Sequence, residues 1–205
     1  MKKTIGLVWI LGLAFAATAQ EIVVQYDFNG DPGTAYATTT HADVAASSKI
    51  LLTTVEWFDW DIDSQNVTYH PQDQLWFKHR RVDPPLDFNV TIQEGRVLTL
   101  NSLNLDYRGH NGAPFNQITW YYNDTDDGSG EYTLLGSVPI ADPALETFLT
   151  FTVTPETPPN GLSGTVHLRA VFGNDADYSS GCLDNITLNG TIEDGPIQGT
   201  VFYTQ

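Results

Sequence analysis

The sequence is poor in cysteine. Its 205 residues include a single one, Cys182, so no disulfide bond can form within the chain. A chain of this length can bury a sizeable core, which must therefore stabilise the fold, alone or together with a bound metal ion. We expect Cys182 to be a small buried apolar residue rather than a reactive thiol.

Basic residues are also scarce. Nine Lys and Arg stand against 25 Asp and Glu, which gives a formal net charge of −16. This balance excludes nucleic acid and anionic lipid as partners, because both require clustered positive charge. It suits a solvated extracellular surface or one that collects Ca²⁺. The one basic cluster, Lys78, Arg80 and Arg81, is expected to be a solvated strand face, with acidic-sugar binding as the alternative.

Long apolar runs are absent except at the N-terminus. Lys2 and Lys3 precede the apolar residues 5–17, and Ala17-Thr18-Ala19 has the small residues of a cleavage site. Residues 1–19 are therefore predicted to be a secretory signal peptide of bacterial type. The run is shorter than the roughly 20 residues of a membrane span. We expect a protein that is secreted or held at the cell surface, without a membrane span, and with a net charge of −18 once the two lysines are removed.

Helical periodicity is missing as well. Strand-like segments arrive instead, separated by turn signals, which is typical of an antiparallel sandwich. The predicted fold is all-β: a single-domain antiparallel jelly-roll β-sandwich at residues 20–192, followed by a tail at 193–205 with room for one extra strand. The predicted strands are 21–28, 50–62, 75–82, 86–92, 97–107, 115–123, 131–140, 147–153, 165–172 and 181–192, and residues 34–48 are predicted to be a surface loop.

Residues 181–192 are the predicted closing strand, in which apolar and polar residues alternate from Ile186 onward. Asp184 has the parity of Ile186, so we expect its carboxylate on the core side. A buried carboxylate needs backbone N–H groups, a base or a metal ion as its partner. Asn189-Gly190 is expected to end the strand with a turn.

A resemblance is carried by six stretches: Tyr26–Phe28, Asp87–Thr91, Leu98–Tyr107, Ile118–Tyr122, Val166–Phe172 and Leu183–Thr191. Over roughly residues 22–192 the chain resembles the jelly-roll domains of secreted bacterial surface proteins, including those of PEP-CTERM type, and carbohydrate-binding modules and other galactose-binding-like sandwiches. The resemblance implies a glycan-binding sandwich. The chain lacks the sorting tail of that group, and its Trp-rich residues 55–77 are not part of the common pattern.

The resemblance also implies a structural Ca²⁺ between the first and last strands. The oxygen ligands expected for it are Asp27, Asn29, Asp31 and Asp184. These side chains converge if the first and last strands are neighbours. The alternative is that they cap turns and accept from backbone amides. A second acidic group, Asp124, Asp126 and Asp127, is expected to be a solvated hairpin tip.

Aromatic side chains are the candidates for sugar stacking, because sugars present flat C–H faces to aromatic rings. The candidates are Trp57, Trp60, Trp76, Trp120, Tyr122 and Tyr178. Any of them could instead fill the core. Trp57 and Trp60 have opposite strand parity, so at least one of them is expected in the core. Tyr178 lies in the predicted loop 173–181, so it is expected to be the least buried of the candidates.

Catalytic signatures are absent. The five histidines are scattered without metal-ligand spacing, and no G-x-S-x-G elbow occurs. We therefore expect a non-catalytic protein that binds a polysaccharide or surface glycan. The alternative is a structural subunit of an extracellular matrix, sheath or filament that self-associates by strand addition, with residues 193–205 as the donor. A polysaccharide-degrading enzyme comes third.

Overall fold

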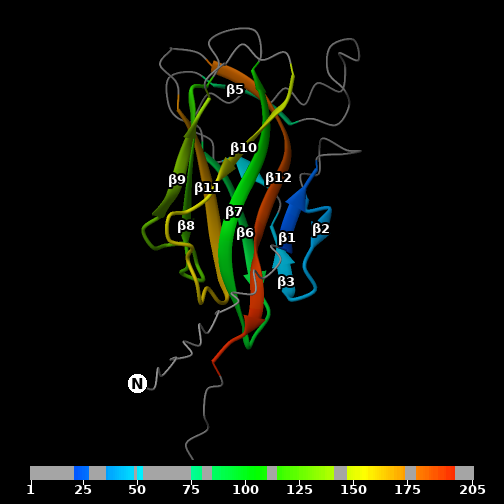
Figure 1. Ribbon diagram of the computed structural model, residues 1–205, viewed down its shortest axis with the longest axis vertical. Helices are drawn as coiled ribbons and strands as arrows, with labels where there is room; N and C mark the ends of the chain where they lie inside the picture. Colours follow the sequence, from blue (N-terminus) through cyan, green and yellow to red (C-terminus); the bar gives the residue numbers. More distant parts are fainter. Residues whose placement is uncertain are drawn as a thin grey trace, which may run out of the picture.

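The computed structural model describes residues 21–27, 36–48, 50–52, 75–79, 85–109, 115–140, 147–173 and 179–196. Their strands form two antiparallel sheets that pack face to face (Figure 1). The predicted all-β antiparallel sandwich is confirmed. In this part of the chain there is no helix long and apolar enough to cross a membrane. The predicted signal peptide, residues 1–19, lies outside the described residues.

The first sheet has the strand order β10-β7-β12-β1-β2, and β5 also pairs with β12. The two longest strands, β7 and β12, run side by side along the length of the molecule (Figure 1). The strands of this sheet are β1 (Glu21–Tyr26), β2 (Thr39–Thr40), β5 (Leu75–His79), β7 (Arg96–Gly109), β10 (Leu149–Val153) and β12 (Ser179–Asp194). The first and last strands are thus neighbours, as expected.

The second sheet has the order β3-β6-β11-β8-β9, and β4 pairs with β6. Among β1 and β6 to β12, only β8 and β9 are consecutive strands of one sheet, and every other connection crosses to the opposite sheet. This is the jelly-roll arrangement. The strands are β3 (Val44–Ser47), β4 (Leu51–Leu52), β6 (Pro85–Ile92), β8 (Gln117–Asn123), β9 (Thr133–Pro139) and β11 (Thr165–Gly173).

The core lies between the two sheets and follows the period-2 pattern of the strands. In β11, the alternate residues Val166, Leu168, Ala170 and Phe172 are fully buried. Aromatic rings connect the layers: Phe88 contacts Tyr26 at 5.1 Å and Trp120 at 6.1 Å between ring centroids, both edge to face. Burial of these alternate faces is the main term that stabilises the sandwich.

A bulge in β12 overturns the expected orientation of Asp184. The pairing with β7 passes from Asp184 opposite Asp106 to Ile186 opposite Leu105, which leaves Asn185 as an extra residue. Asn185 takes the left-handed conformation, with φ of 44°. Leu183 and Ile186 are therefore both buried, and Asp184 lies on the outer face. The prediction that Asp184 points toward the core is wrong.

The expected turn at Asn189-Gly190 is also absent. β12 continues to Asp194, two residues beyond the predicted limit. Asn189 and Gly190 lie opposite Ser102 and Leu100, so the extra residue of the register shift here is Asn101 of β7. A Cβ at Gly190 would lie 2.4 Å from the backbone oxygen of Thr99, so glycine lets the two strands approach closely. The glycine therefore marks a close approach to β7, beside the bulge of that strand, rather than a strand end.

The predicted surface loop at residues 34–48 contains two short strands, β2 and β3. β2 consists of two threonines, which favour strands, whereas the alanines and serine of β3 do not, so hydrogen bonds to other strands also determine the structure of this segment. The amide of His41 donates to the Val23 carbonyl at 2.9 Å, and the amide of Ser48 donates to the Asn89 carbonyl at 2.9 Å. The segment thus bonds to both sheets.

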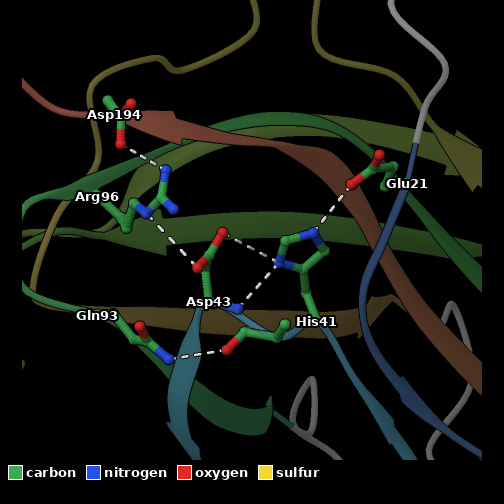
Figure 2. Close-up of polar contacts among 7 residues, drawn as sticks. Glu21, His41, Asp43, Gln93, Arg96 and Asp194 are labelled. Atoms are coloured by element: carbon green, nitrogen blue, oxygen red, sulfur yellow. Dashed lines mark hydrogen bonds and ion pairs between the residues drawn. The ribbon is translucent and has the colours of Figure 1, made fainter.

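Hydrogen bonds and ion pairs join His41 and Asp43 of this segment to residues at the ends of β1, β7 and β12 (Figure 2). The His41 Nδ1 accepts from the Asp43 amide at 3.1 Å, so Nε2 carries the proton that bonds Glu21 at 2.9 Å. Arg96 lies 3.5 Å from Asp43 and donates to Asp194 at 2.6 Å. These contacts join β1, β7 and β12 at one end of the sandwich, which indicates a structural role.

Candidate functional site

Two of the predicted aromatic platforms take different positions in the sandwich. Trp120 is only 1% exposed and packs against Phe88 in the core, so its interpretation as a stacking platform is wrong. Tyr122 is half-buried against the core and also lines a groove at the sandwich edge. Trp76 lies in β5, but its side chain is outside the described part of the chain, as are Trp57, Trp60 and Tyr178.

The outer face of the second sheet instead carries a paired arginine and aspartate at its centre. Arg169 in β11 lies directly opposite Asp87 in β6. Its Nε donates to Oδ1 of Asp87 at 2.7 Å and its Nη2 donates to Oδ2 at 2.9 Å. This is the bidentate geometry that the planar guanidinium favours. The Arg169 side chain is 32% exposed and that of Asp87 is 18% exposed, so both reach the surface.

Two tyrosines adjoin this pair. The ring centroid of Tyr132 lies 4.1 Å from the Arg169 guanidinium carbon, a cation–π contact. Tyr121 in β8 lies directly opposite Arg169 on the side away from Asp87. The hydrogen bond to Asp87 raises the pKa of Arg169, and partial burial raises the pKa of Tyr132 despite the nearby cation. Arg169 therefore remains charged and Tyr132 neutral at physiological pH.

Further polar and apolar groups surround the centre. His167 and Asn89 lie opposite each other, two residues along their strands from Arg169 and Asp87 and on the same outer face. Leu134 lies opposite Tyr121, with 60% of its surface exposed. We call this surface the Arg169 face and define it by its residues Asp87, Asn89, Tyr121, Tyr132, Leu134, His167 and Arg169. It combines apolar ring surface with fixed donors and acceptors.

The hairpin tip at residues 124–130 borders this face and is held by its own hydrogen bonds. Asn123, 2% exposed, donates to the carbonyls of Gly128 and Gly130 and accepts from the amide and hydroxyl of Thr125. Asp126 accepts from the Thr165 amide and Asp127 from Ser129. Asp127 therefore caps the turn at the tip, Asp126 bonds the tip to the first residue of β11, and Asp124 is exposed. The expectation of a surface hairpin tip is confirmed.

The Arg169 face was not predicted from the sequence, although strand alternation indicates the direction of two of its side chains. Strict alternation places Tyr121 opposite in direction to Trp120, and Arg169 opposite in direction to the apolar residues of β11. In β11 the alternation also shows which face is buried, whereas in β8 aromatic residues occupy both faces and the period does not decide between them. The 82-residue separation of Asp87 and Arg169 hides their pairing altogether.

The proposed calcium ligands are only partly described. Asp27 follows the buried Tyr26 and is half-buried, and Asp184 occupies the outer face of the neighbouring strand β12. Asp106 lies opposite Asp184 and accepts from Thr150 at 2.5 Å and Asn185 at 3.1 Å. Asn29 and Asp31 lie outside the described residues. Within the described ranges no three His, Cys, Asp or Glu side chains gather closely enough to hold a metal ion, so calcium stays a prediction.

Cys182 is buried, as expected. Burial raises the pKa of its thiol, although the Nη2 of Arg108 lies 3.6 Å from its sulfur and opposes this shift. A raised pKa lowers the thiolate fraction at neutral pH. The thiol is therefore a packing residue.

An open groove of about 950 Å³ runs between the edge strands of the two sheets. Its walls are β9, the end of β10 and the proline-rich residues 154–160, and Tyr122 contributes to its lining. Gly136 permits the strands to approach here, because a Cβ at this position would lie 2.9 Å from Val153. The groove thus follows the edge of the sandwich rather than an outer face.

No family model matches this chain, and no curated protein has significant similarity to it. Solved structures with a similar fold include the xylan-binding CBM22-1 domain of Xyn10C from Paenibacillus barcinonensis, with 14% identity and a TM-score of 0.43 over 85% of this chain and 97% of that one. They also include CBM32-1 of a family 31 glycoside hydrolase from Clostridium perfringens, with 14% identity and a TM-score of 0.43 over 72% of this chain and 97% of that one. A third is the mannan-recognising module TmCBM27, with 10% identity and a TM-score of 0.42 over 85% of this chain and 99% of that one. These likenesses concern the fold alone.

Proposed function

We propose that this chain is a secreted, non-catalytic β-sandwich that binds a polysaccharide on its Arg169 face. The observation that carries the proposal is the stack of Tyr132 on Arg169, with Arg169 held by two hydrogen bonds to Asp87. Aromatic rings and a fixed charged pair thereby meet on one outward surface.

The chemistry of this face suits a sugar. The C–H face of a pyranose packs against an aromatic ring, and neighbouring hydroxyls bond to planar carboxylate and guanidinium groups. The Asp87 carboxylate supplies acceptors and Arg169 supplies donors. Because each holds the other in place, little side-chain entropy is lost when a ligand binds.

The charges favour a neutral ligand. Arg169 is already neutralised by Asp87, and the whole chain has a formal net charge of −16. A polyanionic polysaccharide would be repelled by this field at low salt. We therefore expect binding to an uncharged polysaccharide in preference to an acidic one.

Native affinity electrophoresis against neutral and acidic polysaccharides tests the proposal. We expect one neutral polysaccharide to retard the protein, and Tyr132→Ala to remove most of this retardation. Tyr36→Ala is the matched control, because Tyr36 is 57% exposed and does not belong to the Arg169 face. Its retardation should equal that of the unaltered protein.

Two results would overturn the proposal. The first is the absence of retardation by every polysaccharide in the panel. The second is retardation that survives in both Tyr132→Ala and Tyr121→Ala, which would place the ligand elsewhere, such as the groove beside Tyr122.

A further inference from the structure

The edge strands of the two sheets differ in the features that prevent pairing with another chain, and one edge strand has no such feature. Exposed edge strands normally carry charges, prolines, bulges or very few residues, which prevents them from pairing with another chain. β2 and β4 have two residues each, and β3 contains a register shift. β9 has a bulge opposite Trp120 and Tyr121 and ends at Pro139.

β10 has none of these devices. Residues 147–154 read Thr-Phe-Leu-Thr-Phe-Thr-Val-Thr, without a charge, proline or glycine, in a chain that has 25 acidic residues. β10 pairs with β7 on one side, and no strand of the described part of the chain pairs with its other side. Leu149 is 46% exposed at this edge. Pro155 limits the unprotected segment to these eight residues.

We propose that two copies of this chain pair through β10, edge to edge and antiparallel, about a two-fold axis at Phe151. This register places Leu149 opposite the partner's Val153, Phe151 opposite the partner's Phe151, and Thr150 opposite the partner's Thr152. Apolar side chains then meet apolar ones on the core side, and threonines meet threonines on the outer side. The segment is self-complementary, as a two-fold interface requires.

Charge and available space favour a second copy of this chain as the partner that pairs with the β10 edge. Two molecules with a net charge of −16 repel each other, so they associate best through a segment that carries no charge of its own. Residues 147–154 are such a segment, although Asp106 of β7 accepts from Thr150 beside it. The groove between β9 and residues 152–160 also leaves open space beside part of the β10 edge. Pairing would join the two six-stranded first sheets into one continuous sheet.

The symmetry has a consequence for ligand binding. A two-fold axis that pairs Phe151 with its copy stands perpendicular to the sheet, so equivalent faces of both copies point the same way. Both Arg169 faces of the dimer could then bind the same polysaccharide surface. A bivalent arrangement of this kind strengthens binding without new contacts.

The test is the mass of the purified protein in solution by sedimentation equilibrium, which does not depend on glycan binding. We expect a concentration-dependent dimer. The variant Thr150→Lys/Thr152→Lys places two pairs of like charges across the interface and should raise the dimer dissociation constant by about tenfold. The variant Thr150→Glu/Thr152→Glu should do the same, and an equimolar mixture of the two variants should recover a dimer that contains one copy of each.

The matched control is Thr39→Lys/Thr40→Lys, which adds the same charge to exposed residues at the opposite edge of the same sheet. It should dimerise like the unaltered protein. The proposal is wrong if the unaltered protein is monomeric at every concentration, or if the lysine variant dimerises as strongly as this control. It is also wrong if the mixture of lysine and glutamate variants stays monomeric.

Discussion

Arg169 and Asp87 lie directly opposite each other in neighbouring strands and share two hydrogen bonds of 2.7 and 2.9 Å on the outer face of the second sheet. Partial solvent exposure limits the contribution of this pair to stability, because water screens the charges. The pair therefore contributes little to folding, and under the proposed function its fixed geometry, with Tyr132 stacked on the guanidinium, serves to present both groups to a glycan.

A double-mutant cycle measures this limit. Asp87→Ala and Arg169→Ala should show a coupling free energy of about 0.5–1 kcal/mol in denaturant unfolding. The control pair is Arg96 and Asp194, which are 2.6 Å apart, but the Asp194 side chain is 89% exposed. Its coupling should be near zero. Equal coupling in both pairs would show that the Asp87–Arg169 pair is not held more firmly than an ordinary surface contact.

Truncation of Trp120 distinguishes a core residue from a ligand platform. Trp120→Ala should destabilise the protein by about 3–5 kcal/mol, because it leaves a cavity beside Phe88. Tyr132→Ala, on the exposed face, should cost far less. Urea unfolding of both variants checks this difference. A Trp120→Ala protein of normal stability that fails to bind polysaccharide would restore the platform interpretation.

High pH should unfold the protein through two buried tyrosines. Burial raises the pKa of Tyr26 and Tyr107 above their ordinary value of about 10. The folded state thus favours the neutral phenol, so this stability is fully present below pH 10 and is lost as the pH rises above it. Phenolate absorbance and circular dichroism, followed together, should show these two tyrosines ionising only as the strands melt.

Tyr26→Phe is the informative variant in this titration. It removes one ionisable phenol, and with it the hydrogen bond to the Ser48 carbonyl at 2.9 Å. Its alkaline transition should move to higher pH even though its stability at pH 7 falls slightly. A transition at unchanged pH in both Tyr26→Phe and Tyr107→Phe would contradict this account.

Calcium remains a prediction, and chelation tests it. If Asp27 and Asp184 help to hold Ca²⁺, saturating calcium should raise the free energy of unfolding by about 1–3 kcal/mol over the chelated protein. The double variant Asp27→Asn/Asp184→Asn should lose this gain, whereas Asp127→Asn at the hairpin tip should keep it. Thermal melts that are identical with calcium and with chelator would remove the metal from this protein.

The class of fold and the approximate limits of most strands could be predicted from the sequence. The period-2 alternation in residues 86–92 and 165–172 is local, so it can be recognised without knowing the strand partners. The tip at Asp124–Gly130 was equally clear, because its turn residues follow one another in the chain.

The bulges, the choice of buried face and the contacts between residues far apart in the sequence depend on which strands pair, so they follow only from the tertiary structure. The bulge at Asn185 reverses the parity of β12 and the bulge at Asn101 reverses that of β7, and both appear only when β12 is aligned with β7. Burial of Trp120 and the only partial burial of Tyr121 depend on which face of β8 meets the opposite sheet. Arg169 finds Asp87 because β11 and β6 are neighbours, although 82 residues separate the two side chains. Alternation is a property of one strand, whereas a binding face belongs to several strands brought together by the packing of the sheets.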